Sequence, residues 1–173
     1  MSAPDADSRR HEQHLAPAAL MELDAGLQLR RPVSVEPLEV YDRRGDGHTV
    51  SRHCGTTPQV EAERLAKRPW LEATGSFPDV ATAQRCVEAC VAAHRALVER
   101  WRRGARPRLA ISADMHEVVG DELRRSRWEA GEGPQPATAV RVVLKRDRTY
   151  RSGFAVLTAY PVTVAGDPYP HQP

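Results

Sequence analysis

Cysteine is scarce in this 173-residue chain, and the three that occur, Cys54, Cys86 and Cys90, are odd in number. This argues against the disulfide framework that stabilises many small secreted domains. Aromatic residues are also few, at 5%, whereas fourteen prolines and eleven glycines predict a large share of loop. A chain of this length is long enough to form one hydrophobic core without covalent cross-links, with residues left over for a tail.

The sequence also lacks long apolar runs. Its first fourteen residues, MSAPDADSRRHEQH, contain no apolar core of a signal peptide, and no later segment approaches the length of a membrane span. We therefore expect a protein that is cytoplasmic as synthesised and has no membrane span.

Metal-binding signatures are missing as well. Cys86, Cys90 and His94 recur every four residues on a predicted helix, so three soft or borderline ligands share one face. They coincide with the apolar stripe of that helix, and no ligand pair across a short loop accompanies them, so we interpret them as core residues. No close cluster of Asp and Glu could hold Mg²⁺ either. We expect neither a metal nor another cofactor.

Charge is distributed unevenly although the net charge is only +2. Residues 1–46 hold six Arg and nine Asp or Glu, whereas residues 47–173 hold 19 Lys or Arg and 14 Asp or Glu. A basic body suits a partner that carries phosphates, but an excess of this size does not establish one.

Composition and turn signals divide the chain into three parts. We interpret residues 1–46 as an acidic, partly disordered leader, with a short helix over Pro17–Leu29 and an edge strand or linker over 31–46. Residues 47–164 form the predicted folded domain, and residues 165–173 a loose tail.

The stretch Val140–Pro161 predicts a long antiparallel hairpin. VRVVLK alternates apolar and polar residues, RDRTYRSG supplies turn chemistry, and GFAVLTAY alternates again. Strict alternation places Phe154, Val156, Thr158 and Tyr160 on one face of the second strand. A hydroxyl and a phenol at the end of an apolar strand are well placed to line a cleft, although Thr and Tyr are also ordinary strand residues.

Helices are predicted between the leader and the hairpin. Thr57 and Pro58 suit the start of a helix with Val60 and Leu65 facing inward, Glu72–Asp79 is a predicted turn, and a long helix is expected from Val80 to Arg103.

Short strands are expected after the long helix. They cover Arg108–Ala113 and His116–Val119, and are followed by a helix or turn over GDELRRSRW and a loop at GEGPQP. Helices followed by strands favour an α+β fold with an antiparallel sheet.

Taken in order, GHTVSRHCG, ERLAKR, GSFPD with VATAQRCVEACV, VRVVLKRD and LTAYP resemble the bacterial RNase A-like toxin domain. That domain occurs at the C-terminus of contact-dependent growth inhibition proteins and other polymorphic toxins. The resemblance spans roughly residues 47–161. It implies an RNase A-like fold, with helices packed on a curved antiparallel sheet and no disulfides.

The resemblance also implies the site residues. By position it transfers catalytic roles to His53, Arg64, Thr158 and Tyr160, with His48 as an additional candidate. The chain departs from the family pattern at Cys54 and in the segment Ala73–Phe77, where an extra glycine could reshape one wall of the site.

The implied chemistry is cleavage of RNA without metal, by attack of the 2′-hydroxyl, leaving 2′,3′-cyclic phosphate ends. Histidine suits proton transfer near neutral pH, and arginine offers phosphate oxygens a fork of donors that stays charged. The second proton-transfer group stays open between Tyr160 and His48. The alternative function is a catalytically silent module of the same fold that binds RNA or protein.

The resemblance finally implies partners. These are an RNA substrate and a cognate immunity protein, with delivery to the cytosol of a target cell by an unidentified route. The RNA target, the role of residues 1–46 and the oligomeric state stay open.

Overall fold

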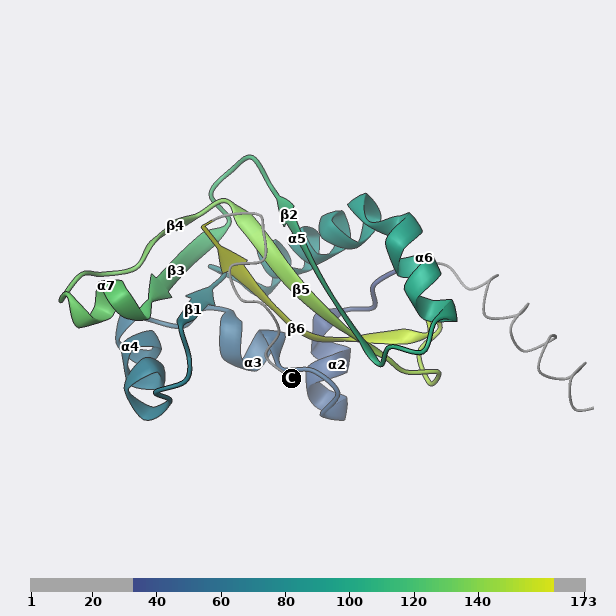
Figure 1. Cartoon of the computed structure of the whole chain (residues 1–173), viewed down its shortest axis with the longest axis horizontal. Helices are drawn as coiled ribbons and strands as arrows, with labels where there is room; N and C mark the ends of the chain where they lie inside the picture. Colours follow the sequence, from purple (N-terminus) through teal and green to yellow (C-terminus); the bar gives the residue numbers. More distant parts are fainter. Residues whose placement is uncertain (1–32, 164–173) are drawn as a thin grey trace, which may run out of the picture. The chain divides into compact units, whose positions relative to one another are not determined.

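The computed structural model describes residues 33–163, in which helices and two small sheets pack together (Figure 1). The helices are α2 (Leu38–Arg44), α3 (Thr49–His53), α4 (Pro58–Lys67), α5 (Val80–Ala93), α6 (Arg95–Arg103) and α7 (Arg125–Glu129). The strands are β1 (Ala73–Ser76), β2 (Arg108–Asp114), β3 (Gly120–Arg124), β4 (Gln135–Ala137), β5 (Ala139–Arg146) and β6 (Phe154–Val162). None of the helices between residues 33 and 163 is long and apolar enough to cross a membrane.

Both sheets are antiparallel and three-stranded, in the orders β2-β5-β6 and β1-β3-β4. The predicted α+β class is therefore confirmed, although the strands form two sheets rather than one. All three cysteines are free thiols, as expected. The predictions for residues 1–30 and for the tail after residue 164 lie outside the described residues.

The predicted hairpin is confirmed as β5 and β6, but one face assignment is wrong. Val143 pairs with Thr158 and Leu144 with Val156, so Leu157 is an extra residue that forms a β-bulge. A bulge reverses the alternation beyond it. Phe154 and Val156 consequently face the core, whereas Thr158 and Tyr160 lie on the opposite face of the sheet.

The second sheet was not predicted. Residues 72–79 were expected to form a turn, yet β1 lies there, and β4 occupies part of the expected loop at GEGPQP. The strand expected at His116–Val119 is instead irregular, and β3 begins at Gly120, with α7 following it. These strands have three to five residues, too few for a period of two to be recognised.

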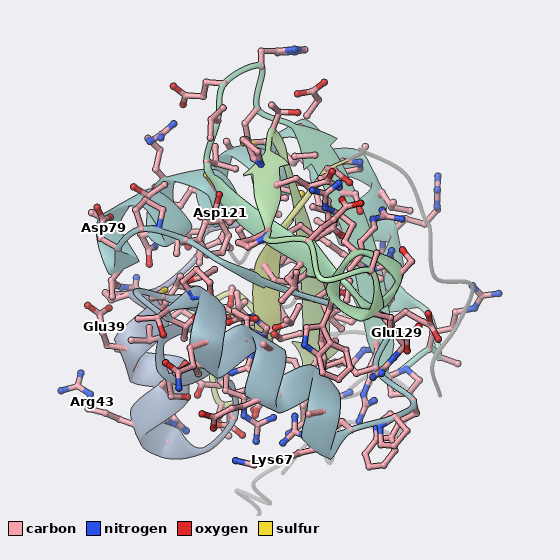
Figure 2. All side chains as sticks on the ribbon, turned by 90° about the vertical axis from the view of Figure 1, so that its left-hand side faces the viewer. Glu39, Arg43, Lys67, Asp79, Asp121 and Glu129 are labelled. Atoms are coloured by element: carbon pink, nitrogen blue, oxygen red, sulfur yellow. The ribbon has the colours of Figure 1, made fainter. Side chains whose placement is uncertain are left out.

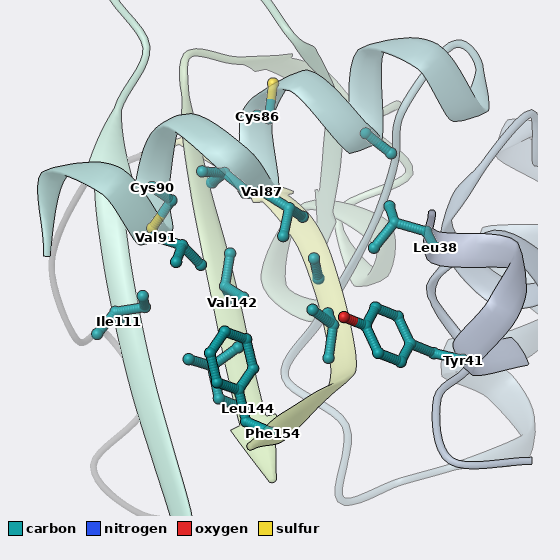
Figure 3. Close-up of a cluster of buried hydrophobic side chains, with 14 of the residues drawn as sticks. Leu38, Tyr41, Cys86, Val87, Cys90, Val91, Ile111, Val142, Leu144 and Phe154 are labelled. Carbon is teal, nitrogen blue, oxygen red and sulfur yellow. The ribbon is translucent and has the colours of Figure 1, made fainter. Parts of the chain in front are cut away.

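Helix α5 covers one face of the β2-β5-β6 sheet and forms the core with it (Figure 3). Val87, Cys90 and Val91 point from α5 toward Val142 and Leu144, and all five are buried. Cys86 is also fully buried, so the interpretation as core residues is confirmed for Cys86 and Cys90, whereas it is wrong for His94, which is only half-buried.

The long helix expected over Val80–Arg103 is divided. His94, with φ −104° and ψ 19°, ends α5 and starts α6, and its Nδ1 lies 2.9 Å from the carbonyl oxygen of Cys90. The amide of His94 donates to the same carbonyl oxygen at 3.2 Å, so the amide and the imidazole of His94 both contact it at the junction of the two helices.

Helix α2 occupies residues expected to be an edge strand or a linker. Leu38 and Tyr41 are buried in the core beside α5 (Figure 3), and the Leu38 amide donates to the Gln84 side chain at 2.9 Å. Helix α2 belongs to the same compact unit as the other described elements. The boundary at residues 46 and 47 stays a prediction, and the packing of α2 favours an earlier one.

Replacing Leu38 with alanine tests the role of α2. We expect the free energy of unfolding to fall by about 2–5 kcal/mol, because a fully buried leucine is removed and a cavity is left. Chemical denaturation measures the change, and Glu39→Ala, an exposed position on the same helix, is the control. A chain beginning at Gly45 should be destabilised further; full stability of that chain would support the boundary at 46 and 47.

The predicted start of α4 is confirmed, with Pro58 in its first turn and the Thr57 hydroxyl accepting from the Val60 amide at 3.4 Å. Leu65 is buried as expected. Val60 is 45% exposed, so its inward orientation is wrong, and Glu61 takes the inward position instead. The hydroxyl of Thr56 donates to the Glu61 carboxylate, which gives that buried group a partner.

Candidate active site

The candidate site lies where the far end of β6 meets β1. Gly75 allows β1 to approach β6 closely, and Gly47 allows the segment before α3 to do the same. A Cβ on Gly75 would lie 2.7 Å from the carbonyl oxygen of Pro161, and one on Gly47 would lie 2.4 Å from that of Val156. Gly75, the extra glycine of the segment Ala73–Phe77, therefore lets β1 pack directly against β6.

His53 ends α3 and reaches across to β1. Its Nδ1 lies 2.8 Å from the carbonyl oxygen of Gly75, while its own carbonyl oxygen accepts from the Phe77 amide at 2.8 Å. A carbonyl oxygen only accepts hydrogen bonds, so Nδ1 carries the proton in the neutral ring. The second ring nitrogen, Nε2, is left with a lone pair that can accept a proton.

The rings of His48 and Tyr160 both lie close to that of the catalytic candidate His53. The ring centroids of His53 and Tyr160 are 5.4 Å apart, and those of His53 and His48 are 6.2 Å apart. His48 is held beside β6 because its amide donates to the carbonyl oxygen of Leu157, the bulge residue, at 3.1 Å. The bulge thus helps to bring α3 and the end of β6 together.

Both histidines are biased toward their neutral forms. Burial lowers the pKa of His53 to about 3, an effect that Arg64 adds to and the Gly75 hydrogen bond opposes. Burial also lowers the pKa of His48, with a further contribution from Arg52. His53 nevertheless keeps part of its surface exposed, so a phosphate entering the site would raise this pKa again.

Arg64 is fixed by contacts along its guanidinium group. It donates to the hydroxyl of Thr74 at 3.0 Å and to the carbonyl oxygen of Arg52 at 2.7 Å, and it lies 3.8 Å from the carboxylate of Glu61. Its side chain is 14% exposed. Arg64 therefore supplies an ordered positive charge whose field reaches both His48 and His53.

The hydroxyl of Thr158 is buried and has no hydrogen-bond partner within residues 33–163. An unpaired buried hydroxyl costs free energy, so it is a candidate for hydrogen bonding to a ligand. Thr158 shares its face of β6 with Tyr160.

Arg141 is a residue that the sequence analysis did not include in the site. It pairs across the strands with Tyr160, and it is only 8% exposed. Directly opposed residues on antiparallel strands point to the same face, so a second cation lies on the face of Thr158 and Tyr160. Its place between Val140 and Val142 in the alternating strand was the signal that it faces away from the core.

Cys54, the residue that departs from the expected pattern, is half-buried beside the site. Its backbone forms an isolated parallel β-bridge with that of Phe77. Burial raises the pKa of its thiol to about 12, so it is not a thiolate near neutral pH. No group of three His, Cys, Asp or Glu among residues 33–163 is arranged to hold a metal ion.

The structure thus brings the rings of His48 and Tyr160 close to that of His53. The charge of Arg64 acts electrostatically on both histidines. Figure 2 looks at this end of the domain, with α4 in front. Glu39, Arg43 and Lys67 point outward at its periphery, away from the residues between α3, β1 and β6.

The family model for the bacterial CdiA-CT RNase A domain matches residues 47–161. The chain belongs to this family. The CdiA-CT RNase A assignment agrees with the toxin-domain resemblance in its sequence. A comparison with curated proteins found no match.

A solved structure supports the same fold. It is the crystal structure of the CdiA-CT/CdiI complex from Y. kristensenii 33638, with a TM-score of 0.60 and 22% sequence identity. The similarity covers 67% of this chain and 99% of the other. At this identity the likeness establishes that the CdiA-CT RNase A domain described here shares that fold.

Proposed function

We propose that this CdiA-CT RNase A-like toxin domain is a metal-independent endoribonuclease. The observation that carries the proposal is the closeness of His53 to both His48 and Tyr160, with the charge of Arg64 acting on both histidines. This arrangement supplies, from side chains alone, the proton-transfer groups and the fixed cation that transesterification of RNA requires.

In the proposed reaction His53 acts as the general base. Its Nε2 takes the proton from the 2′-hydroxyl, and the 2′-oxygen attacks the adjacent phosphorus. The bond from phosphorus to the 5′-oxygen breaks, and that oxygen takes a proton from a general acid, so a 2′,3′-cyclic phosphate and a 5′-hydroxyl result. The Nδ1 contact with Gly75 supports this role, because it fixes the tautomer of the neutral ring with a free Nε2.

Tyr160 is the better candidate for the general acid. A phenol stays protonated at neutral pH, since its ordinary pKa is about 10. His48 is the weaker candidate because burial lowers its pKa below 6.5, which leaves little of the acidic form. We assign to His48 a supporting position beside His53, and to Tyr160 the proton donated to the leaving oxygen.

Arg64 and Thr158 complete the proposed site. Arg64 would neutralise the charge that grows on the phosphorane, because its guanidinium group is already held in place by Thr74 and Arg52. The buried hydroxyl of Thr158 would gain a hydrogen bond to the bound nucleotide.

Incubation of the purified chain with total RNA in excess EDTA tests this function. We expect undiminished cleavage and 2′,3′-cyclic phosphate ends, because no step requires a metal ion. A DNA strand should stay intact, since it lacks the attacking 2′-hydroxyl. Loss of activity in chelator, recovered with Mg²⁺, would contradict the mechanism; RNA binding without any cleavage would favour the silent binding module instead.

We also propose a cognate immunity protein as the natural partner. The similar CdiA-CT domain from Y. kristensenii was crystallised in a CdiA-CT/CdiI complex. A ribonuclease delivered to the cytosol of a target cell would need such an inhibitor in the cell that produces it.

A further inference from the structure

Helix α6 lies at the end of the domain opposite the end that carries α4 and α7 (Figure 1), and the sequence from α6 to the start of β2 is rich in arginine. Glu99 is the one carboxylate between residues 95 and 108, whereas five exposed arginines lie there: Arg95, Arg100, Arg103, Arg106 and Arg108. Two more exposed arginines, Arg148 and Arg151, lie on the turn between β5 and β6.

These segments meet in space. Arg102 at the end of α6 donates to the carbonyl oxygen of Ser152 in the hairpin turn at 2.6 Å. Arg146 donates to the carbonyl oxygens of Trp101 and Arg106 at 2.9 and 3.0 Å, and its guanidinium carbon lies 5.7 Å from the Trp101 ring centroid. The C-terminal end of α6, the start of β2 and the hairpin turn therefore form one surface. We name it the arginine end, with Arg100, Arg103, Arg106, Arg108 and Arg151 as its members.

Most of this charge is not neutralised by the part of the chain that the structure describes. Within residues 33–163, Arg100, Arg106, Arg108 and Arg151 form no ion pair with a carboxylate. Arg108 lies directly opposite Lys145 in the β2–β5 register. Like charges at opposed positions destabilise a sheet. Lys145 forms an ion pair with Asp46 at 3.5 Å, so Arg108 is the charge that an anionic ligand would offset.

Arg108 connects the arginine end to the face of the sheet that carries the candidate site, whereas α6 packs on the opposite face, where Trp101 contacts Phe154. Arg141 and Lys145 are four residues apart on β5 and point to the same face, Arg141 beside Tyr160 and Lys145 beside Arg108. At about 3.3 Å per residue the sheet spans roughly 13 Å between them, and the turn lies about 10 Å further. This span corresponds to on the order of six nucleotides of a stacked strand.

We propose that the arginine end binds the phosphate backbone of a single RNA strand whose scissile bond lies at His53. The inference rests on the proposed function and extends it, because it makes the substrate an RNA long enough to reach from the cleft to the hairpin turn. Guanidinium groups suit phosphate oxygens, and backbone contacts of this kind carry no base preference.

Two triple variants of the full chain test the proposal. The first, Arg106→Ser, Arg108→Ser and Arg151→Ser, removes three charges from the arginine end. The matched control, Lys67→Ser, Arg85→Ser and Arg127→Ser, removes three charges that form ion pairs elsewhere on the surface. If the first variant does not fold, Arg151→Ser alone, a single change in the turn, replaces it in the test.

Binding is measured with a 20-nucleotide RNA whose 2′-hydroxyls are methylated, so that it cannot be cleaved. The slope of log K against log salt should become shallower by about 2 in the first variant, because each single-strand phosphate contact contributes about 0.7. The slope for Arg151→Ser alone should become shallower by about 0.7, and the slope for the control variant should equal that of the unmodified chain. Equal slopes for the first variant and the unmodified chain would overturn the proposal. If the first variant bound RNA normally and lost only the binding of a protein inhibitor, the proposal would be overturned as well.

Cleavage separates this inference from the proposed function. For each substrate, the KM of the first variant is divided by the KM of the unmodified chain. This ratio should be at least tenfold larger for an unmethylated 20-nucleotide RNA than for a dinucleotide, because a dinucleotide is too short to reach the arginine end. A parallel loss on both substrates would overturn the inference. Absence of cleavage by the unmodified chain would reject the proposed function, while the binding slopes would still decide whether the arginine end holds RNA.

Discussion

His53→Ala is expected to reduce RNA cleavage by roughly a hundredfold to ten-thousandfold, the usual effect of losing a general acid or base. The reason is specific to this ring. Its Nδ1 contact with Gly75 directs the Nε2 lone pair away from β1, and no other side chain among residues 33–163 makes the same contact. Initial rates on a dinucleotide and on a longer RNA measure the loss.

His48→Ala is the matched control, since His48 is a second imidazole in the same site whose ring lies 6.2 Å from that of His53. We expect it to retain more activity than His53→Ala. In addition, the acid limb of kcat/KM should lie below pH 6.5, because the pKa of the free base is lowered and protonation inactivates it only at more acidic pH. If His48→Ala abolishes cleavage and His53→Ala leaves it intact, the assignment of the base is wrong.

Arg64→Lys is expected to lower kcat by about a hundredfold to a thousandfold, the range observed when one donor to a developing oxyanion is removed. Lysine keeps the charge but loses the planar fork. It cannot donate in the same geometry to the hydroxyl of Thr74 and the carbonyl oxygen of Arg52. Its ammonium group would therefore occupy several positions rather than one.

Arg85→Lys provides the control for Arg64→Lys, because Arg85 is an exposed arginine on α5 that forms an ion pair with Glu117. We expect its kcat to match that of the unmodified chain. Thermal unfolding should show that Arg64→Lys keeps its fold, so that a loss of rate is not a loss of structure. Wild-type kcat in a folded Arg64→Lys variant would exclude the guanidinium fork from the mechanism.

Local sequence patterns predicted the elements whose stability depends on neighbouring residues. The Thr57 cap with Pro58 identified the start of α4, and two alternating stretches with a turn between them identified β5 and β6. Element order and short motifs also identified the family, and the resemblance then pointed by position to His53, Arg64, Thr158 and Tyr160.

Other features depend on partners that are distant in the sequence. Strands β1 and β3 pair with each other across more than forty residues, and neither alternates for long enough to be recognised alone. Helix α2 is short, and it packs because Leu38 and Tyr41 reach the core beside α5. Burial of Glu61 in place of Val60 likewise depends on its partner, Thr56.

The sequence by itself determined the α+β class, the absence of a disulfide framework and the residue types of the candidate site. Only the tertiary structure decided how those residues face one another. The bulge at Leu157 turns Thr158 and Tyr160 away from the core, and the glycine at position 75 lets β1 approach β6 and offer its carbonyl oxygen to His53. A bulge and a close backbone approach arise from pairing between distant segments, so neither leaves a periodic signal in the chain.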